Sequence, residues 1–343
     1  MFLEVVSTKL INEQRLYICL ILIPLVYIIW RKITSSPPRR RVVGYVKEIR
    51  THPVKSCKPY HVKEIEVSSF GLEFDRQFAL LNEYGTFVTL RKYPKFVLID
   101  QEILGDEIRL RAEGMPDLRL PLKMTKKDGD HVADVTVWSI TAEGVHVSQE
   151  ADDWFAQVLN LEGCKLYCFP TDGPPRRTRD KGQYEVFENY DNTPNTMMYT
   201  DGSPVLILSQ PSLVDLNDKY TEEDLSMDRF RPNIVLEGCK PYEEDTWGRI
   251  QIGDDVIMEG VYPSERCVAI NVVPDKGAMS DKSILKYLNE NRSGPAFTPH
   301  AHKLKGGLFG FNYGVRKTGF IKIGDPVYKL KELQTRSKFM KND

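Results

Sequence analysis

From Val42 onward the chain consists of short runs of β-branched and aromatic residues, each ended by turn residues. Runs of this kind, bounded by Gly, Pro, Asn or Asp, are typical of β-strands. Examples are VVGYVKEI (42–49), HVKEIEV (61–67), RQFALL (76–81) and KFVLI (95–99). The strands do not alternate regularly with helices, and no glycine-rich dinucleotide fingerprint is present, which excludes a Rossmann fold. The pattern predicts a mixed, mostly β body with barrel-like sheets and a few peripheral helices.

Three segments have helical spacing of their apolar residues. Residues 151–160 carry four such residues, residues 210–219 follow Ser209 as an N-cap, and residues 283–289 form the third segment. A turn-rich stretch, residues 171–195, divides the body into two halves, and the second half closes with FIKIGDPVYKL (320–330), in which Gly-Asp-Pro makes a turn.

The N-terminal residues contain an uncharged apolar run, LYICLILIPLVYIIW (16–30). As a helix it would be about 22 Å long, shorter than the ~30 Å hydrocarbon core, and flanking residues could supply the rest. Basic residues follow it at 31, 32 and 39–41, which leaves the body in the cytosol by the positive-inside rule. We expect residues 1–41 to be an uncleaved membrane anchor with a basic linker, typical of the outer mitochondrial membrane; a cleaved signal peptide and a buried core helix are the alternatives.

Charge and cysteine content restrict the possible partners. A net charge of −1 gives no cationic surplus for nucleic acid. The six cysteines are irregularly spaced and include no CxxC pair, so they do not form a disulfide framework or a ferredoxin-like cluster. Free thiols in a reducing compartment are therefore expected.

Among these thiols, Cys267 in YPSERCVAINVV is the most informative. We expect it at the start of an apolar strand (VAINVV), after a polar turn. Arg266 beside it favours the thiolate, which is both a nucleophile and a soft metal ligand. A small buried hydrophobic residue is the alternative interpretation, and no neighbouring Cys or His completes a zinc site.

Several polar residues are expected at the ends of strands, where main-chain N–H groups are also exposed. Cationic, hydroxyl and amide groups in such positions suit a phosphate or another anion, although solvated charges at loop ends are the alternative. These residues are Lys55, Ser56, Arg76, Ser203, Arg231 and Asn233.

Taken together, the segments PVKSC, GLEFDRQF, SPVLILS, FRPNIV, SERC and GDPVY, in this order, resemble the MOSC family. Within that family the likeness is greatest to the amidoxime reducing components, molybdenum enzymes of the outer mitochondrial membrane. The resemblance covers about residues 42–330. It implies an N-terminal MOSC-associated β-barrel domain (42–170), a MOSC domain (171–330) and a polar C-terminal tail (331–343).

The resemblance also implies a molybdenum–molybdopterin cofactor with Cys267 as metal ligand and Arg266 beside it. Two positions depart from the family pattern: Glu265 stands where relatives more often have Ser, and Asn312 where several have Tyr. Both are expected near the cofactor. The residues implied to contact it are Lys55, Ser56 and Arg76 from the first domain, and Ser203, Pro204, Arg231, Asn233 and Asn312 from the second.

The implied reaction is the reduction of N-hydroxylated compounds such as amidoximes and hydroxylamines. No NADH or flavin site is expected in this chain, so the resemblance implies electrons from a b-type cytochrome and its NADH-dependent reductase. Anchoring on one membrane would raise the effective concentration of these partners. The alternatives are a cofactor carrier related to molybdenum cofactor sulfurase, and a catalytically silent membrane-tethered binding protein.

Overall fold

The computed structural model describes residues 41–177, 196–294 and 304–333. The predicted anchor, residues 16–30, therefore lies outside the described residues. Within the described ranges, no helix combines the length and apolar character needed to cross a membrane. The described residues from Val42 onward form one compact unit.

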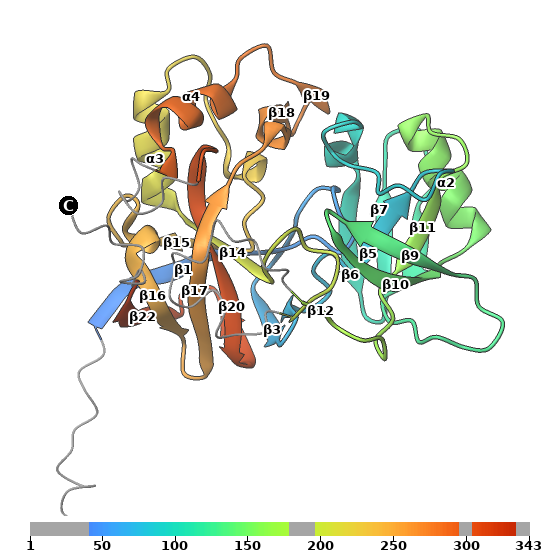
Figure 1. Ribbon diagram of the computed structural model, residues 1–343, viewed down its shortest axis with the longest axis horizontal. Coiled ribbons are helices and arrows are strands. Elements are labelled where there is room, and N and C mark those ends of the chain that lie inside the picture. Colours follow the sequence, from blue (N-terminus) through green and yellow to red (C-terminus); the bar gives the residue numbers. More distant parts are fainter. Residues whose placement is uncertain (1–40, 178–195, 295–303, 334–343) are drawn as a thin grey trace, which may run out of the picture. The chain divides into compact units, whose positions relative to one another are not determined.

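Seven strands of this unit pair into a closed ring, seen on the left of Figure 1. The ring closes because β1 pairs with β22 at one edge and antiparallel with β15 at the other, where Ile49 lies opposite Ile234. Side chains such as Trp247 and Phe311 fill its interior. In spatial order the strands are β15 (Ile234–Glu237), β14 (Val205–Ser209), β20 (Leu308–Lys317), β17 (Val256–Glu265), β16 (Trp247–Ile252), β22 (Pro326–Glu332) and β1 (Arg41–Thr51).

A second group of strands, on the right of Figure 1, forms two smaller sheets that do not close into a ring within the described residues. A separate core, which includes Phe96 and Phe155, holds these sheets together. The four-stranded sheet contains β5 (Phe78–Leu81), β11 (Lys165–Cys168), β10 (Ile140–His146) and β9 (Val132–Val137); the other contains β6 (Asp100–Leu104), β7 (Glu107–Arg111) and β8 (Leu118–Pro121).

Strands that are far apart in the sequence pair with one another in these sheets. Strand β2 (Tyr60–Val62) extends β1, while β3 (Glu64–Ser68) pairs with both β4 (Gly71–Leu72) and the late strand β21 (Gly319–Lys322). The first strands of the chain therefore lie in sheets with its last strands. Two further pairs are short: β12 (Arg176–Arg177) with β13 (Thr196–Met197), and β18 (Val272–Val273) with β19 (Ala278–Met279).

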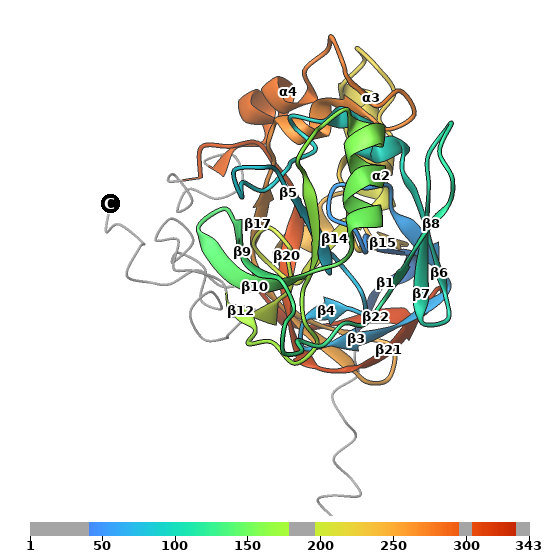
Figure 2. The same ribbon diagram turned by 90° about the vertical axis from the view of Figure 1, so that its right-hand side faces the viewer.

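The three predicted helices are confirmed as α2 (Gln149–Leu159), α3 (Gln210–Lys219) and α4 (Ile284–Asn291). Each begins after a serine whose hydroxyl accepts a hydrogen bond from a main-chain N–H of the first turn, which stabilises the helix start. Helix α2 packs against β11 and β8, and Figure 2 shows it in front of the strands.

Two strand predictions were wrong. Residues 95–98 lie in the 3-10 helix η1 (Pro94–Leu98), and Ile99 is its C-cap; Pro94 fixes φ in the first turn, which favours a helical start over a strand. Cys267 does not open a strand: it follows β17, which includes the YPSE segment expected as a turn, and it precedes the 3-10 helix η5 (Val268–Asn271).

Candidate functional site

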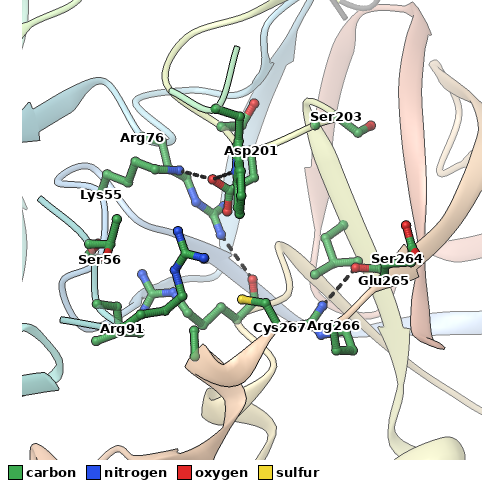
Figure 3. Close-up of a pocket in the computed structure, with 18 of the residues that line it drawn as sticks. Lys55, Ser56, Arg76, Arg91, Asp201, Ser203, Ser264, Glu265, Arg266 and Cys267 are labelled. Atoms are coloured by element: carbon green, nitrogen blue, oxygen red, sulfur yellow. Dashed lines mark hydrogen bonds and ion pairs between the residues drawn. The ribbon is translucent and has the colours of Figure 1, made fainter. Parts of the chain in front are cut away.

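A pocket of about 830 Å³ lies between loops of the two groups of strands (Figure 3). It contains all but one of the predicted cofactor-contacting residues. Pro204 is the exception, because its main chain packs against Gly71 and it does not line the pocket. The predicted residues that line it are Lys55, Ser56, Arg76, Ser203, Arg231, Asn233, Arg266, Cys267 and Asn312, together with Glu265.

Three of these residues have an unusual backbone conformation. Ser56, Arg76 and Arg231 have φ values of 80°, 51° and 54°, in the left-handed region that favours glycine. Each such residue costs on the order of 1–3 kcal/mol, and such residues concentrate at functional sites. Here the conformation lets a loop turn sharply at the end of β1 or just before β5 and β15, so that the side chain lines the pocket.

Lys55 places a buried ammonium group at one side of the pocket. Its Nζ donates to Oδ1 of Asp201 at 2.7 Å and lies 5.2 Å from the centroid of the Phe87 ring. Burial lowers the pKa of Lys55, and the carboxylate of Asp201 opposes that shift. A charged amine that is only 7% exposed needs an anionic partner, and one carboxylate supplies it in the absence of ligand.

Arg231 and Arg266 lack such a partner. Neither guanidinium has a carboxylate within ion-pair distance in the described part of the chain. Arg231 donates to the carbonyl of Cys57 at 2.8 Å, and Arg266 donates to Ser264 Oγ at 2.9 Å and to the carbonyl of Phe230 at 2.7 Å. Burial lowers the pKa of each to about 10. The Nε atom of Arg266 is buried without any partner.

The pocket as a whole has a cationic surplus. Of the described residues that line it, six are Lys or Arg and two, Asp201 and Glu265, are acidic. Arg229 is neutralised from outside the pocket by Glu223, with both contacts at 2.7 Å. Arg76 is likewise paired with Asp75, and Lys55 with Asp201. Among the described residues, this leaves Arg91, Arg231 and Arg266 without a carboxylate within ion-pair distance, and an anion bound here would satisfy their charge and their free N–H donors.

Cys267 brings a thiol to the same pocket. It is half-buried and precedes η5 directly, and it neighbours Arg266 in the chain. Of the described cysteines, Cys267 alone lines the pocket. Cys57, by contrast, is fully buried, and burial raises the pKa of its thiol.

Ser203 and Asn233 line the pocket and also make hydrogen bonds to neighbouring strands. Ser203 Oγ donates to the carbonyl of Tyr313 at 2.7 Å. Asn233 accepts from the main-chain N–H of Leu206 at 3.0 Å and donates to the carbonyl of Arg50. Both side chains therefore tie the starts of β14 and β15 to neighbouring strands, and their contribution to the pocket is largely to hold its wall in place.

Several polar and aromatic residues of the pocket were not predicted from the sequence, among them Arg91, Trp138 and Asp201. Arg91 and Asp201 lie in loops with no local signal. Trp138 does have a local sequence signal, because it interrupts an alternating run (VTVWSIT) at the position where a hairpin turn is needed.

Residues 43–162 match the family described as "MOSC N-terminal beta barrel domain", and residues 194–328 match "MOSC domain". Mitochondrial amidoxime reducing component 2 of Bos taurus is 35% identical over 308 residues, which cover 88% of each chain. Mitochondrial amidoxime-reducing component 1 of Homo sapiens is 36% identical over 309 residues, again 88% of each chain. The chain belongs to the MOSC family of amidoxime-reducing components. Its resemblance to that family, inferred from six short segments, is thereby confirmed.

The two family matches meet at the pocket. Lys55, Arg76, Arg91 and Trp138 fall within the first match, whereas Arg231, Arg266 and Cys267 fall within the second. In this member of the family, neither matched segment alone contains the full set of pocket residues.

Proposed function

We propose that this protein is a molybdenum cofactor-dependent reductase of N-hydroxylated compounds such as amidoximes and hydroxylamines. The observation that carries the proposal is the presence, in one pocket, of the half-buried thiol of Cys267 and of guanidinium groups that no carboxylate of the described residues pairs with. Membership of a family whose relatives are named as amidoxime-reducing components supports it.

The residues present suit this cofactor. A pterin with a terminal phosphate needs cationic hydrogen-bond donors, and Arg231 and Arg266 have free donors, including the buried Nε of Arg266. A thiolate is a suitable ligand for a soft metal site. The pocket volume of about 830 Å³ is within the usual range for sites that take a cofactor-sized ligand.

Each residue would then have a separate role. Cys267 would ligate the metal, and Arg266 would place a positive charge beside it. Lys55, Ser56, Arg76, Arg231 and Asn312 would bind the pterin and its phosphate, and Ser203 and Asn233 would hold the wall. When bound, the cofactor supplies the two-electron reduction of the N–O bond, which with two protons gives the amidine or amine and water.

The electron donor and location are part of the same proposal. We propose that a b-type cytochrome and its NADH-dependent reductase supply the electrons, and that residues 1–41 anchor the protein on the outer mitochondrial membrane with its body in the cytosol. The names of the relatives, which are mitochondrial, agree with the organelle.

The test is metal and pterin analysis of the full-length chain, expressed in a host that makes molybdopterin, for wild type and Cys267→Ala. We expect near-stoichiometric molybdenum in the wild type, amidoxime reduction with an artificial electron donor, and an altered metal-centre spectrum with no turnover in the variant. A folded wild type without molybdenum or pterin would refute the proposal. Unchanged turnover in Cys267→Ala would refute the assignment of the metal ligand.

A further inference from the structure

Trp138 occupies a position where a large aromatic residue is unexpected. It lies in the two-residue turn between β9 and β10, where Val137 pairs with Ile140. Its φ is 61°, a left-handed conformation that such turns usually assign to Gly or Asn. The side chain is 53% exposed and lines the pocket. Neither turn geometry nor core packing explains the choice of tryptophan, which leaves a binding role.

The indole ring is held on two sides by other pocket residues. Its Nε1–H donates to Oδ1 of Asp201 at 3.0 Å, the same oxygen that accepts from Lys55. The Cζ atom of Arg91 lies 4.7 Å from the centroid of the ring. Figure 3 shows Arg91 and Asp201 among the residues of the pocket.

A buried arginine fixes the hairpin that carries this ring. Arg176 is 2% exposed, and its guanidinium donates to the carbonyls of Val137 and Ile140, at 3.1 and 3.2 Å, on either side of the turn. It also donates to the carbonyls of Met198 and Thr200, which precede Asp201. One side chain therefore ties the Trp138 turn to the Asp201 loop, so the ring is preorganised before any ligand binds.

Arg91 supplies the charge beside this ring. It is exposed, and no carboxylate lies within ion-pair distance of it in the described ranges, so its donors remain available to an anion. An indole face favours a planar conjugated group, and a guanidinium favours a carboxylate or phosphate through charge-assisted hydrogen bonds.

On the basis of the proposed function, we propose that Trp138 and Arg91 form a specificity-determining wall for the substrate. This wall favours N-hydroxylated compounds whose C=N–OH group is conjugated to a planar ring that carries a carboxylate or phosphate. Trp138 contacts the ring, and Arg91 binds the anionic substituent. Arg176 and Asp201 are positioning residues for this wall.

The experiment compares benzamidoxime with 4-carboxybenzamidoxime as substrates of the cofactor-loaded, full-length protein. In Arg91→Gln we expect KM for the carboxylate-bearing substrate to rise about tenfold more than KM for benzamidoxime, the effect of one charge-assisted hydrogen bond. Lys92→Gln is the matched control, because it removes the same charge one residue away and Lys92 does not line the pocket. Trp138→Ala should raise KM for both substrates, and Trp138→Phe should restore much of the loss.

A binding measurement without turnover tests the role of Trp138 and Arg91 independently of the proposed reductase activity. Without an electron donor, 4-carboxybenzamidoxime should quench part of the tryptophan fluorescence of the wild type and none of that part in Trp138→Phe. Equal KM effects on both substrates in Arg91→Gln would refute the proposed role of Arg91 in substrate specificity. Loss of molybdenum or pterin from that variant would also refute it, and would assign Arg91 to the cofactor phosphate. If the loaded wild type reduces neither substrate, the proposed function fails, and the quenching still tests the wall.

Discussion

Arg76 and Arg231 are joined across 155 positions of sequence: Nη2 of Arg76 donates to the main-chain carbonyl of Arg231 at 3.1 Å. Both residues have positive φ, and Arg231 in turn donates to the carbonyl of Cys57 on the loop that follows β1. The cations of the pocket therefore also connect its two sides. Removing either side chain should change both the binding of an anion and the contact between the loops.

Arg231→Met should reduce the molybdenum and pterin retained after gel filtration by at least about tenfold, because a charged donor to the phosphate is lost. Arg249→Met is the matched control, since Arg249 lies on β16 away from the pocket and pairs with Glu259. Equal cofactor content in the two variants, with normal circular dichroism, would contradict the role of Arg231.

Asp75→Asn should remove an acid-sensitive part of the stability. Asp75 is fully buried, contacts Arg76 and accepts the main-chain N–H of His52 at 2.9 Å. Burial alone would raise the pKa of Asp75, but Arg76 and His52 lower it to about 2. Because the folded pKa lies below the unfolded one, the stabilisation is complete above about pH 4 and is lost as the pH falls towards 2.

The measurement is the free energy of unfolding between pH 5 and pH 2. We expect wild type to lose on the order of 2 kcal/mol more than Asp75→Asn over this range. At neutral pH the variant should be less stable by about 3 kcal/mol, because Arg76 loses its buried carboxylate. Asp128→Asn, in an exposed turn, serves as the control. Parallel pH profiles for wild type and Asp75→Asn would contradict the assignment.

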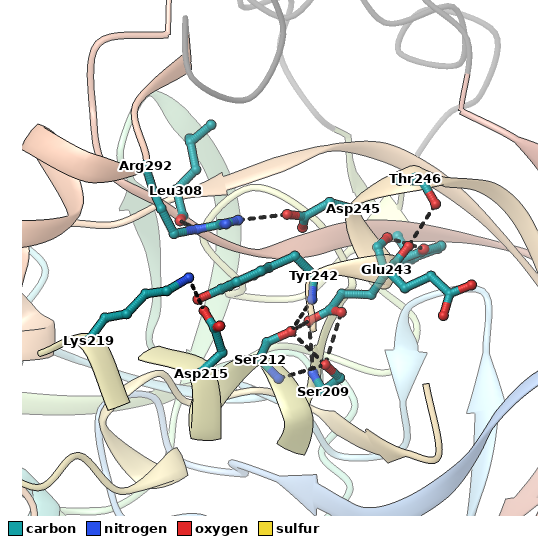
Figure 4. Close-up of polar contacts among 12 residues, drawn as sticks. Ser209, Ser212, Asp215, Lys219, Tyr242, Glu243, Asp245, Thr246, Arg292 and Leu308 are labelled. Atoms are coloured by element: carbon teal, nitrogen blue, oxygen red, sulfur yellow. Dashed lines mark hydrogen bonds and ion pairs between the residues drawn. The ribbon is translucent and has the colours of Figure 1, made fainter. Parts of the chain in front are cut away.

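Asp245→Asn should change the pH dependence of the unfolding free energy in the opposite direction. Asp245 and Glu244 are adjacent buried carboxylates. Asp245 accepts a hydrogen bond from Arg292 at 2.7 Å (Figure 4). Glu244 accepts hydrogen bonds from Ser209 and Ser212. Burial and the charge of Glu244 raise the pKa of Asp245 to about 7, although Arg292 opposes them. A raised carboxyl pKa gives stability that is present below about pH 4 and is lost as the pH rises towards 7.

Urea unfolding at pH 5 and pH 7.5 tests this expectation. The difference in unfolding free energy between wild type and Asp245→Asn should shift by on the order of 2 kcal/mol, with wild type relatively less stable at the higher pH. Asp254→Asn, at an exposed turn, should show no such shift. A difference that is independent of pH would mean that Asp245 stays ionised with Arg292 throughout.

Gly71→Ala should damage the pocket through Pro204. Gly71 has φ +101°, and a Cβ there would lie 2.5 Å from the carbonyl oxygen of Pro204. Gly105 also has positive φ (+67°), but a Cβ there meets nothing within 4 Å. We expect Gly105→Ala to cost about 1 kcal/mol and Gly71→Ala about 2 kcal/mol more, with reduced molybdenum content only in the latter. Equal costs by urea unfolding would show that the loop before β14 shifts freely.

Much of the pocket could be predicted from the sequence because its residues lie next to strand ends that have strong local signals. Asn233 directly precedes a buried apolar strand, Arg231 lies three residues before the same strand, and Arg76 lies two residues before another. Arg91 and Asp201 could not be predicted this way, since a tertiary contact, the one each makes with Trp138, brings them together. The strand error at residues 95–99 has a local origin: Pro94 starts a 3-10 turn, which overrides the β-propensity of the residues that follow.

The pairing of β1 with both β15 and β22 has a consequence for biosynthesis. The first described strand leaves the ribosome early, yet one of its partners, β22, is formed by residues 326–332, almost 300 positions later. Contacts of such long sequence separation form late. The nascent chain therefore cannot complete the ring, or the loops that it supports around Cys267, until residues 326–332 have been synthesised. Cofactor loading would then follow the synthesis of β22, and a chain stalled before that strand would present unpaired strand edges to chaperones and proteases.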